Sequence, residues 1–439
     1  MSREPGSLFT GDSIGHEMYE FIASLYPLCR SITGDGVRAT LQKIQQHIPL
    51  TVHEVPSGTV VFDWTVPREW NITDAYIKDN RGKKIADFHR SNLQVVNYSV
   101  PIKKKLSLSE LKPHIFTLPD HPQWVPYRTT YYEENWGFCL SHEQFSQLRD
   151  GEYEVCIETS LHPGHLTYGE YLLPGATADE ILVSCHICHP SLCNDNLSGI
   201  AVATMLARAL QQGLRRYSYR FLFIPGTIGA ITWLWVNETR VKAIKHGWVL
   251  AGVGDAGPLT YKRSRQGDAE IDQVFAHVLA RDDRGGTVID FSPYGYDERQ
   301  FGSPGFNLPV GCLMRTPFGQ YPEYHTSADN LEFIHTAALA DSLKTCLHVC
   351  SVLEHNRRYI NLNPKCEPQL GKRGLYRTIG GPLPPDGVDG LALLWVLNLS
   401  DGSQSLLDIA ERTGYMFDQL CVAARLLVER GLLREATTL

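Results

Sequence analysis

The first fifty residues carry two apolar patterns with helical spacing. In the segment 15–32 (GHEMYEFIASLYPLCRSI) apolar side chains recur every three or four residues: Met18, Phe21, Ile22, Leu25 and Leu28. This spacing puts them on one face, so we predict an amphipathic helix. After the Gly-Asp-Gly sequence at 34–36, the segment 37–48 (VRATLQKIQQHI) predicts a second helix.

From Val52 the pattern changes to an alternation with a period of two. Short β-rich runs such as 59–66 (TVVFDWTV), 74–79 (DAYIKD) and 93–100 (LQVVNYSV) are separated by Pro and Gly turns. These runs continue to about Tyr153. We therefore predict a small β-rich inserted domain over residues 52–155.

From residue 156 to about 362, compact apolar runs alternate with helical patterns. Four runs predict buried strands: 180–185 (EILVSC), 219–224 (YRFLFI), 247–254 (GWVLAGVG) and 310–315 (VGCLMR). Helical patterns follow at 199–213 and 336–356. Strands that alternate with helices predict an α/β core, a three-layer sandwich around a mixed, mostly parallel sheet. Residues 1–51 and 156–362 would form this discontinuous core.

The last segment, 363–439, has a different organisation. A Pro/Gly-rich linker with GGPLPP at 380–385 precedes two helical patterns, 405–414 and 417–433, which are joined by a Gly turn. Two helices followed by a short β wing predict a winged-helix domain. Four arginines between 408 and 434 are offset by four acidic residues. We therefore expect a protein contact or domain packing here, and nucleic acid is not expected as a partner.

Composition narrows the class of protein. A hydrophobic content of 43% and a charged content of 20% are typical of a soluble globular protein, and the net charge of −7 argues against nucleic acid as the main partner. No apolar run reaches the length of about 18 residues that a membrane span needs, and the start lacks the apolar core of a signal peptide. The 11 cysteines are odd in number and scattered, which favours reduced thiols and a cytoplasmic protein.

Polar residues with metal-binding chemistry follow the predicted strands. His186 and, nine residues later, Asp195 follow the first run, and Asp255 follows the third. Glu323, Tyr324 and His325 come after the fourth run. Ligands bind outside the carboxyl ends of strands in open α/β sheets, and imidazole with carboxylate is the ligand set of catalytic zinc. Any one of these residues could have an ordinary structural role, such as a helix cap or a turn. The prediction of a metal site therefore rests on their placement together at the ends of the predicted strands.

The stretch 186–199 (HICHPSLCNDNLSG) allows two other interpretations. Cys188 and Cys193 could form half of a structural zinc site with Cys346 and Cys350, although their spacing does not match a CxxC pair. A thiol nucleophile at Cys185 or Cys188, beside His186 or His189, is a second alternative. Neighbouring residues on a strand point to opposite faces, which disfavours proton sharing between them.

These residues resemble a known family. His186, the sequence NDNLSG with Asp195, VGDAG with Asp255 and EYHTSAD with His325 look like the motifs of M28 zinc aminopeptidases. The chain is most similar to a bacterial branch of aminopeptidase-like proteins that adds an inserted β domain and a C-terminal winged helix. The resemblance also includes 61–77 (VFDWTVPREWNITDAYI) and 295–311 (GYDERQFGSPGFNLPVG).

The resemblance implies roles for the metal site. His186 and Asp255 would hold one zinc ion, His325 would hold a second, and Asp195 would bridge the two. Asp297 would line the pocket in the loop that faces the substrate.

Charge, more than motif, suggests anchors for a substrate carboxylate. The candidates are Arg315, Tyr324, Arg263 and Arg265. Arg128, in the PYRTTYY segment 126–132 of the insert, could also bind a carboxylate, although an arginine there is commonly a surface residue.

Two positions depart from the family pattern. The sequence PGTIG (225–229) has Gly226 where the resemblance puts the general base and Thr227 where it puts a metal ligand. Cys188 stands where an aspartate would orient His186. A single zinc held by His186, Asp195 and Asp255 is then an alternative to two ions, with Glu323 or His189 completing the site.

The sequence thus predicts a zinc-dependent, aminopeptidase-like hydrolase that acts on an aminoacyl amide or a small peptide. Loss of a general base costs roughly 10²–10⁴-fold in rate, so Glu323, Asp297 or the substrate would have to supply it. Two alternatives stay open: changed amide or aminoacyl chemistry in a biosynthetic pathway, and an inactive scaffold that binds a ligand or protein. Inserted domains of this kind often serve dimer contacts, so a homo-oligomer is a further expectation.

Overall fold

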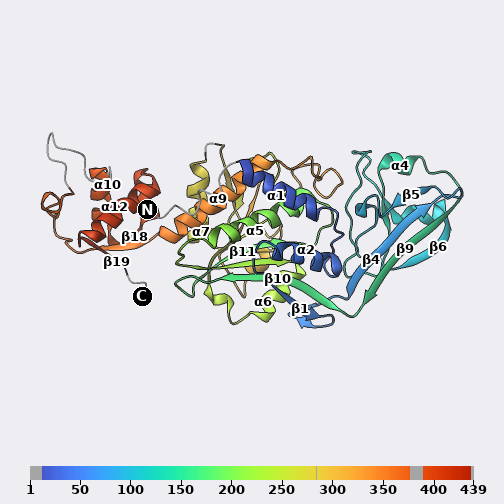
Figure 1. Ribbon diagram of the computed structural model, residues 1–439, viewed down its shortest axis with the longest axis horizontal. Helices are drawn as coiled ribbons and strands as arrows, with labels where there is room; N and C mark the ends of the chain where they lie inside the picture. Colours follow the sequence, from blue (N-terminus) through green and yellow to red (C-terminus); the bar gives the residue numbers. More distant parts are fainter. Residues whose placement is uncertain (1–11, 283, 376–388, 437–439) are drawn as a thin grey trace. The chain divides into compact units, whose positions relative to one another are not determined.

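The computed structural model describes residues 12–282, 284–375 and 389–436, which fall into two compact units, 1–347 and 348–439 (Figure 1). The first unit contains an eight-stranded sheet, in the order β1 (Thr51–Pro56), β10 (His165–Leu173), β12 (Ser218–Ile224), β11 (Glu180–His186), β13 (Ile244–Leu250), β16 (Val310–Met314), β14 (Thr260–Lys262) and β15 (Thr287–Ile289). The four central strands, β12 to β16, are parallel, and β1 and β10 join antiparallel. The predicted mixed α/β core is therefore confirmed.

Helices cover both faces of this sheet (Figure 1). α1 (Asp12–Leu25) and α5 (Gly199–Leu210) lie on one face, and α6 (Ile228–Val236) lies on the other. Every residue of β11 and β12 is buried, because a parallel strand covered on both faces has no solvent side. Outside the β-rich segment, the unit also contains α2 (Asp35–Gln45), α7 (Glu270–Ala280), α8 (Glu298–Phe301) and the start of α9 (Thr336–His355).

A second, antiparallel sheet lies in the β-rich segment, in the order β5 (Lys84–Asp87), β4 (Glu69–Lys78), β9 (Glu152–His162) and β6 (Ile102–Ser107). It has a core of its own, which includes Ile77, Phe138 and Val155. β9 crosses the predicted border at residue 155 and pairs with β4 as far as His162. Short elements complete the segment: β2 (Val60–Val61), β3 (Trp64–Thr65), α3 (Leu108–Leu111), β7 (Ile115–Phe116), β8 (Phe138–Cys139) and α4 (His142–Ser146).

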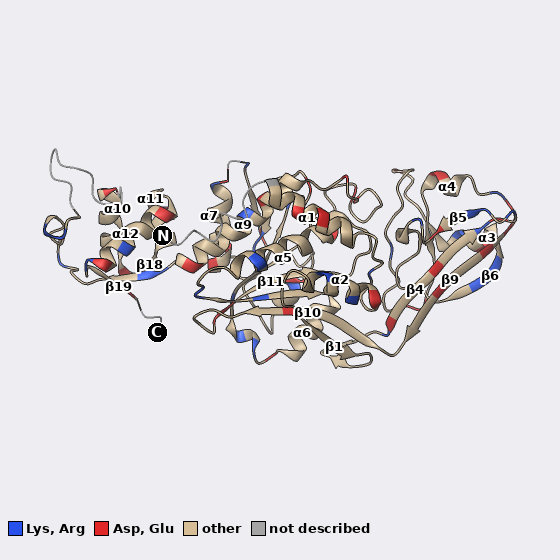
Figure 2. Cartoon of the chain, viewed as in Figure 1, with Lys and Arg blue, Asp and Glu red and all other residues tan. Residues whose placement is uncertain are grey.

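The second unit has the elements of a winged helix. Its strands β18 (Asp401–Ser405), β17 (Arg358–Asn361) and β19 (Leu433–Glu435) form an antiparallel sheet, and its helices are α10 (Gly390–Leu399), α11 (Leu406–Thr413) and α12 (Phe417–Glu429). Gly414, at φ +75°, ends α11 in the left-handed region that glycine adopts readily. Figure 2 shows that basic and acidic residues are interspersed along this unit. The predicted linker at 380–385 lies outside the described residues.

Among the described residues, no helix combines the length and the apolar character that crossing a membrane requires.

Candidate metal centre

The centre lies at the carboxyl end of β11, in the middle of the large sheet. His186 is the last residue of this strand, and Asp195 lies in the loop before α5. Asp329 holds the loop, since its carboxylate accepts hydrogen bonds from the backbone N–H groups of Asn194 (2.6 Å) and Asp195 (2.9 Å). Asn196 ties the other side of the loop to the end of β13 through the carbonyl of Leu250 (2.9 Å).

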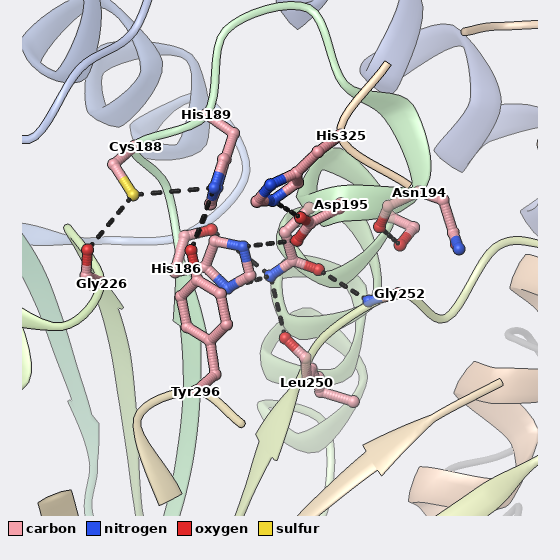
Figure 3. Close-up of polar contacts among 12 residues, drawn as sticks. His186, Cys188, His189, Asn194, Asp195, Gly226, Leu250, Gly252, Tyr296 and His325 are labelled. Atoms are coloured by element: carbon pink, nitrogen blue, oxygen red, sulfur yellow. Dashed lines mark hydrogen bonds and ion pairs between the residues drawn. The ribbon is translucent and has the colours of Figure 1, made fainter. Parts of the chain in front are cut away.

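The carboxylate of Asp195 lies between two imidazoles (Figure 3). Its Oδ1 is 2.8 Å from Nε2 of His186, and its Oδ2 is 2.9 Å from Nε2 of His325. Burial raises the pKa of Asp195, but His189 and His186 lower it more strongly and hold it well below its usual range. Burial lowers the pKa of His189 well below its ordinary value.

Three buried side chains here could hold a metal ion. The donor atoms of His186, His189 and Asp195 all lie within 4.8 Å of one another. Two imidazole nitrogens and one carboxylate oxygen fit the ligand preference of zinc, and three protein ligands leave a position for water or substrate. Arg30 holds the backbone at this point, because its Nε donates to the carbonyl of His189 (2.8 Å).

Tyr296 packs against two of these residues. Its ring stacks on that of His186, with centroids 3.7 Å apart, and its hydroxyl is 3.1 Å from Nε2 of His189. The same ring fills the space beside Gly226, where an added Cβ would lie 2.2 Å from Cε1 of Tyr296. The sequence pattern pointed to the neighbouring Asp297 but not to Tyr296, because nothing in the local sequence marks a tyrosine as the partner of a glycine 70 residues away.

A buried ion pair fixes the loop that carries Tyr296. Glu298 accepts a hydrogen bond from the backbone N–H of Tyr296 (3.0 Å), and it pairs with Lys262, whose Nζ also donates to the carbonyl of Tyr294 (2.7 Å). The side chain of Asp297 is fully buried, and neither carboxylate oxygen has a hydrogen-bond partner among the described residues. Burial and the nearby Glu298 raise its pKa well above the usual range.

The β-rich insert reaches the centre through Tyr127. The backbone N–H of Tyr127 donates to the carbonyl of His325 (2.7 Å), and its ring centroid is 5.2 Å from those of both His325 and His189. His325 has a φ of +56°, which residues other than glycine rarely adopt. Tyr324 stacks on the ring of His325 at 3.9 Å. Two chain segments thus fix the position of His325.

Asp255 is not part of the group of three donors. Its Oδ1 accepts hydrogen bonds from the backbone of Gly257 (2.7 Å) and from the hydroxyl of Thr316 (2.8 Å), and its Oδ2 accepts one from Asn194 (2.9 Å). The structure therefore places Asp255 beside the loop that carries Asp195, with both oxygens bound to protein donors. Its role as a zinc ligand stays a prediction.

The predicted substrate anchors lie in different surroundings. Arg315 is buried and donates to Asp341 (2.5 Å), to Ser342 and to the carbonyls of Gly257 and Ala338. Arg263 lies 3.7 Å from Asp290, and exposed Arg265 donates to Asn307 (2.7 Å). The guanidinium of Arg128 lies 5.8 Å from the ring centroid of Phe116.

Only Tyr324 among the candidate anchors has a described contact with a residue of the centre, through its stacking on His325. Glu323, two residues before His325, is half-buried, and its backbone carbonyl accepts a hydrogen bond from the hydroxyl of Thr326. The roles given to Glu323 and to the anchors stay predictions.

One alternative based on cysteine has a contact in the structure, because Sγ of Cys188 lies 3.8 Å from Nδ1 of His189 (Figure 3). None of the cysteines in the described chain forms a disulfide, and the group of metal-donor side chains contains no thiol. Burial raises the pKa of Cys188 and of Cys346 to about 12, which disfavours the thiolate that a nucleophile or a zinc ligand requires.

Comparisons with known proteins agree with this architecture. A family described as a domain of unknown function (DUF4910) matches residues 19–356, and a winged helix-turn-helix family matches residues 357–435. A Clostridium acetobutylicum protein named as a polysaccharide biosynthesis protein with an aminopeptidase-like domain is 54% identical over 420 residues, which are 96% of each chain.

Solved structures also show similarity to aminopeptidase-like proteins. A crystal structure from Clostridium acetobutylicum, named as a peptidase, has a TM-score of 0.92 at 52% identity and covers 97% of both chains. A zinc aminopeptidase from Bacillus subtilis has a TM-score of 0.56 at 13% identity over 77% of this chain and 94% of that one. An M28 peptidase precursor from Shewanella amazonensis has a TM-score of 0.54 at 13% identity over 78% and 95%. The chain therefore belongs to the DUF4910 family. Its aminopeptidase-like core has the fold of M28 zinc aminopeptidases, and a winged helix follows at the C-terminus.

Proposed function

We propose that this protein is a zinc-dependent hydrolase that cleaves an amide bond in an aminoacyl compound or a small peptide. The observation that carries the proposal is the buried donor group of His186, His189 and Asp195, whose donor atoms lie within 4.8 Å of one another. One zinc ion fits this set. When bound, zinc lowers the pKa of a coordinated water and polarises a carbonyl group.

The surrounding residues hold the proposed ligands in position. His325 contacts the second oxygen of Asp195 and so orients the carboxylate toward His186 and His189. Partners of this kind are as important as the ligands, because they set ligand orientation and basicity. In this proposal His325 is a positioning residue and not a ligand of a second ion.

Glycine has no side chain that accepts a proton, so a residue other than Gly226 must act as the general base. Asp297 is fully buried and its raised pKa favours the protonated form, which makes it a poor base at neutral pH. Glu323 lies on the same loop as His325 and is half-buried, so we propose it as the residue that accepts the proton. Tyr296 places a hydroxyl 3.1 Å from Nε2 of His189, where it can donate a hydrogen bond to a polarised carbonyl.

One observation favours a second candidate, a changed reaction on an amide or aminoacyl group in a biosynthetic pathway. The ring of Tyr296 lies beside Gly226 and fills the space that the side chain of a general base would need. The site has therefore lost the base and gained an aromatic side chain in its place. The name of the Clostridium acetobutylicum relative, which refers to polysaccharide biosynthesis, agrees with this candidate.

Metal content and hydrolysis together test the proposal. The full chain would be loaded with zinc, desalted and examined by elemental analysis, alongside Asp195→Asn and His189→Ala. His246→Asn, which changes a buried histidine that lies 3.3 Å from the hydroxyl of Tyr217, is the matched control. We expect one zinc per chain in the wild type and the control, and much less in the two site variants.

Hydrolysis is then measured on a panel of aminoacyl anilides and aminoacyl amides. Cleavage that a chelator abolishes supports the hydrolase. A bound zinc ion with the whole panel uncut favours the second candidate. A wild type that retains no zinc contradicts both.

A further inference from the structure

The β-rich insert contains a cavity of about 510 Å³, lined mostly by exposed residues. Three segments form it: the chain from the end of β4 through β5, the chain around the end of α4, and the start of β9. None of the donors of the metal centre is part of its lining. Small-molecule sites commonly have volumes of about 300–1,000 Å³. The cavity is therefore large enough for a small molecule, and it is separate from the proposed reaction.

Positive charge exceeds negative charge around this cavity. Three acidic residues line it together with five basic ones, which are Arg81, Lys83, Lys84, Arg90 and Arg149. Of the acidic residues, Glu152 pairs with Lys105 (3.2 Å), which lies outside the lining. Figure 2 shows basic residues on and beside β5. This local surplus contrasts with the net charge of −7 on the whole chain.

Four of the five basic side chains have no ion-pair partner within the described part of the chain. Lys84 pairs with Asp87 at 2.9 Å. The other four are exposed, and no described carboxylate lies within 4.0 Å of their charged groups: Arg81, Lys83, Arg90 and Arg149. A concave surface lined by charges of one sign focuses the electric field and attracts a ligand of the opposite sign. We call this site the basic cavity.

The backbone fixes two of the segments that carry these cations. Oδ1 of Asp79 accepts hydrogen bonds from the backbone N–H groups of Arg81 and Lys83, each at 2.9 Å. Across the cavity, the hydroxyl of Tyr153 donates to the carbonyl of Arg149 (2.7 Å) and accepts from its backbone N–H (3.1 Å). The backbone is thus held while the charged ends are left without a protein partner. Such preorganisation lowers the entropic cost of binding.

We propose that the basic cavity binds a small diphosphate ester. Three of the four unpaired cations are arginines, whose paired N–H groups match phosphate oxygens. A phosphate group carries about 1.5–2 negative charges at neutral pH, so two of them balance four cations better than a single carboxylate does. The half-buried side chains of Ile85 and Leu148, also in the lining, offer apolar surface to the esterified part of the ligand.

Binding of adenosine diphosphate and of inorganic pyrophosphate to the full chain tests the proposal at physiological salt. Affinity is measured by calorimetry for the wild type and for Arg81→Ala and Arg149→Ala, which remove cations from two different segments. Arg240→Ala is the matched control, because Arg240 is exposed and lies outside the basic cavity. Citrate, which carries its charge on carboxylates, is the comparison anion.

We expect adenosine diphosphate to bind at least as tightly as pyrophosphate, and both to bind more tightly than citrate. Each cavity variant should weaken the binding of adenosine diphosphate about tenfold, because it removes charged hydrogen bonds, while Arg240→Ala binds like the wild type. The proposal is overturned if the wild type does not bind adenosine diphosphate, if citrate binds as tightly, or if both cavity variants bind like the wild type.

One further variant separates the basic cavity from the proposed zinc site. His189→Ala removes a proposed zinc ligand, and it should bind adenosine diphosphate like the wild type, since the basic cavity needs no metal ion. Loss of binding in His189→Ala would place the anion at the metal centre and would overturn the proposal. Zinc content is measured separately, so failure of the proposed hydrolase and failure of the basic cavity are distinct results.

Discussion

The ring of Tyr296 occupies the space into which a side chain at Gly226 would project. An added Cβ would lie 2.2 Å from its Cε1 and 3.2 Å from Cβ of His186. The glycine and the tyrosine are thus a matched pair, although 70 residues separate them. Restoring a carboxylate at position 226 requires that the ring move.

Gly226→Glu alone should destabilise the protein and should not increase hydrolysis. Overpacking of this kind typically costs about 1–3 kcal/mol. Gly226→Glu combined with Tyr296→Ala should recover part of that loss, since the small side chain makes room for the carboxylate. Urea unfolding of both single variants and the double variant measures the coupling between the positions. Gly305→Glu is the control, because no atom lies within 4 Å of an added Cβ there.

His325→Ala should weaken zinc binding without abolishing it. His325 contacts Oδ2 of Asp195 but is not one of the three grouped donors, so its loss removes orientation and not a ligand. Loss of such a partner typically costs 10–100-fold in metal affinity. Competition with a chromophoric zinc chelator gives the affinity. A loss as complete as that of Asp195→Asn would instead identify His325 as a ligand.

Asp329→Ala should destabilise the loop that presents Asp195. Its carboxylate accepts the N–H groups of Asn194 and Asp195, and both would be left buried without this acceptor. An unsatisfied buried group costs about 1–3 kcal/mol. We expect a lower urea midpoint and weaker zinc binding, while Asp290→Ala, at an exposed carboxylate, leaves both unchanged. Equal midpoints for the two variants would contradict this account.

Glu69 should contribute stability that is lost in acid. Hydrogen bonds from Arg38 and from the backbone of His165 outweigh burial and lower its pKa to about 2. Because this pKa lies below the value of about 4.3 expected in the unfolded chain, the contribution is present above pH 4.3 and is lost as the pH falls toward 2. The stability difference between the wild type and Glu69→Gln should therefore be largest near neutral pH and shrink below pH 4.3. Glu134→Gln, at an exposed glutamate, should show a much smaller difference.

The full chain should not give a saturable band shift with duplex DNA. The winged-helix unit mixes charges, for example Arg425 within 4.0 Å of Glu429 and Arg358 within 4.0 Å of Asp408. Specific DNA binding requires a basic face that neutralises phosphates. A shift at low protein concentration that persists at physiological salt would contradict this prediction.

The amino-acid sequence was sufficient for the architecture. The runs EILVSC and YRFLFI became the neighbouring parallel strands β11 and β12, because buried strands need continuous apolar segments and this requirement is local. His186 and Asp195 lie together for a similar reason. They flank one loop at the carboxyl end of one strand, so their proximity needs little information from the rest of the chain.

Distant packing decided the remaining features of the centre. His189 joins the donors while Asp255 is bound by Thr316 and Asn194, and Tyr296 fills the space beside Gly226. The contacts of Asp255 and of Tyr296 join segments that lie far apart along the chain, whereas His189 follows His186 in the same loop as Asp195. Side-chain spacing within one segment reports which face a residue occupies, but only the folded packing of several segments determines which atoms come within bonding distance.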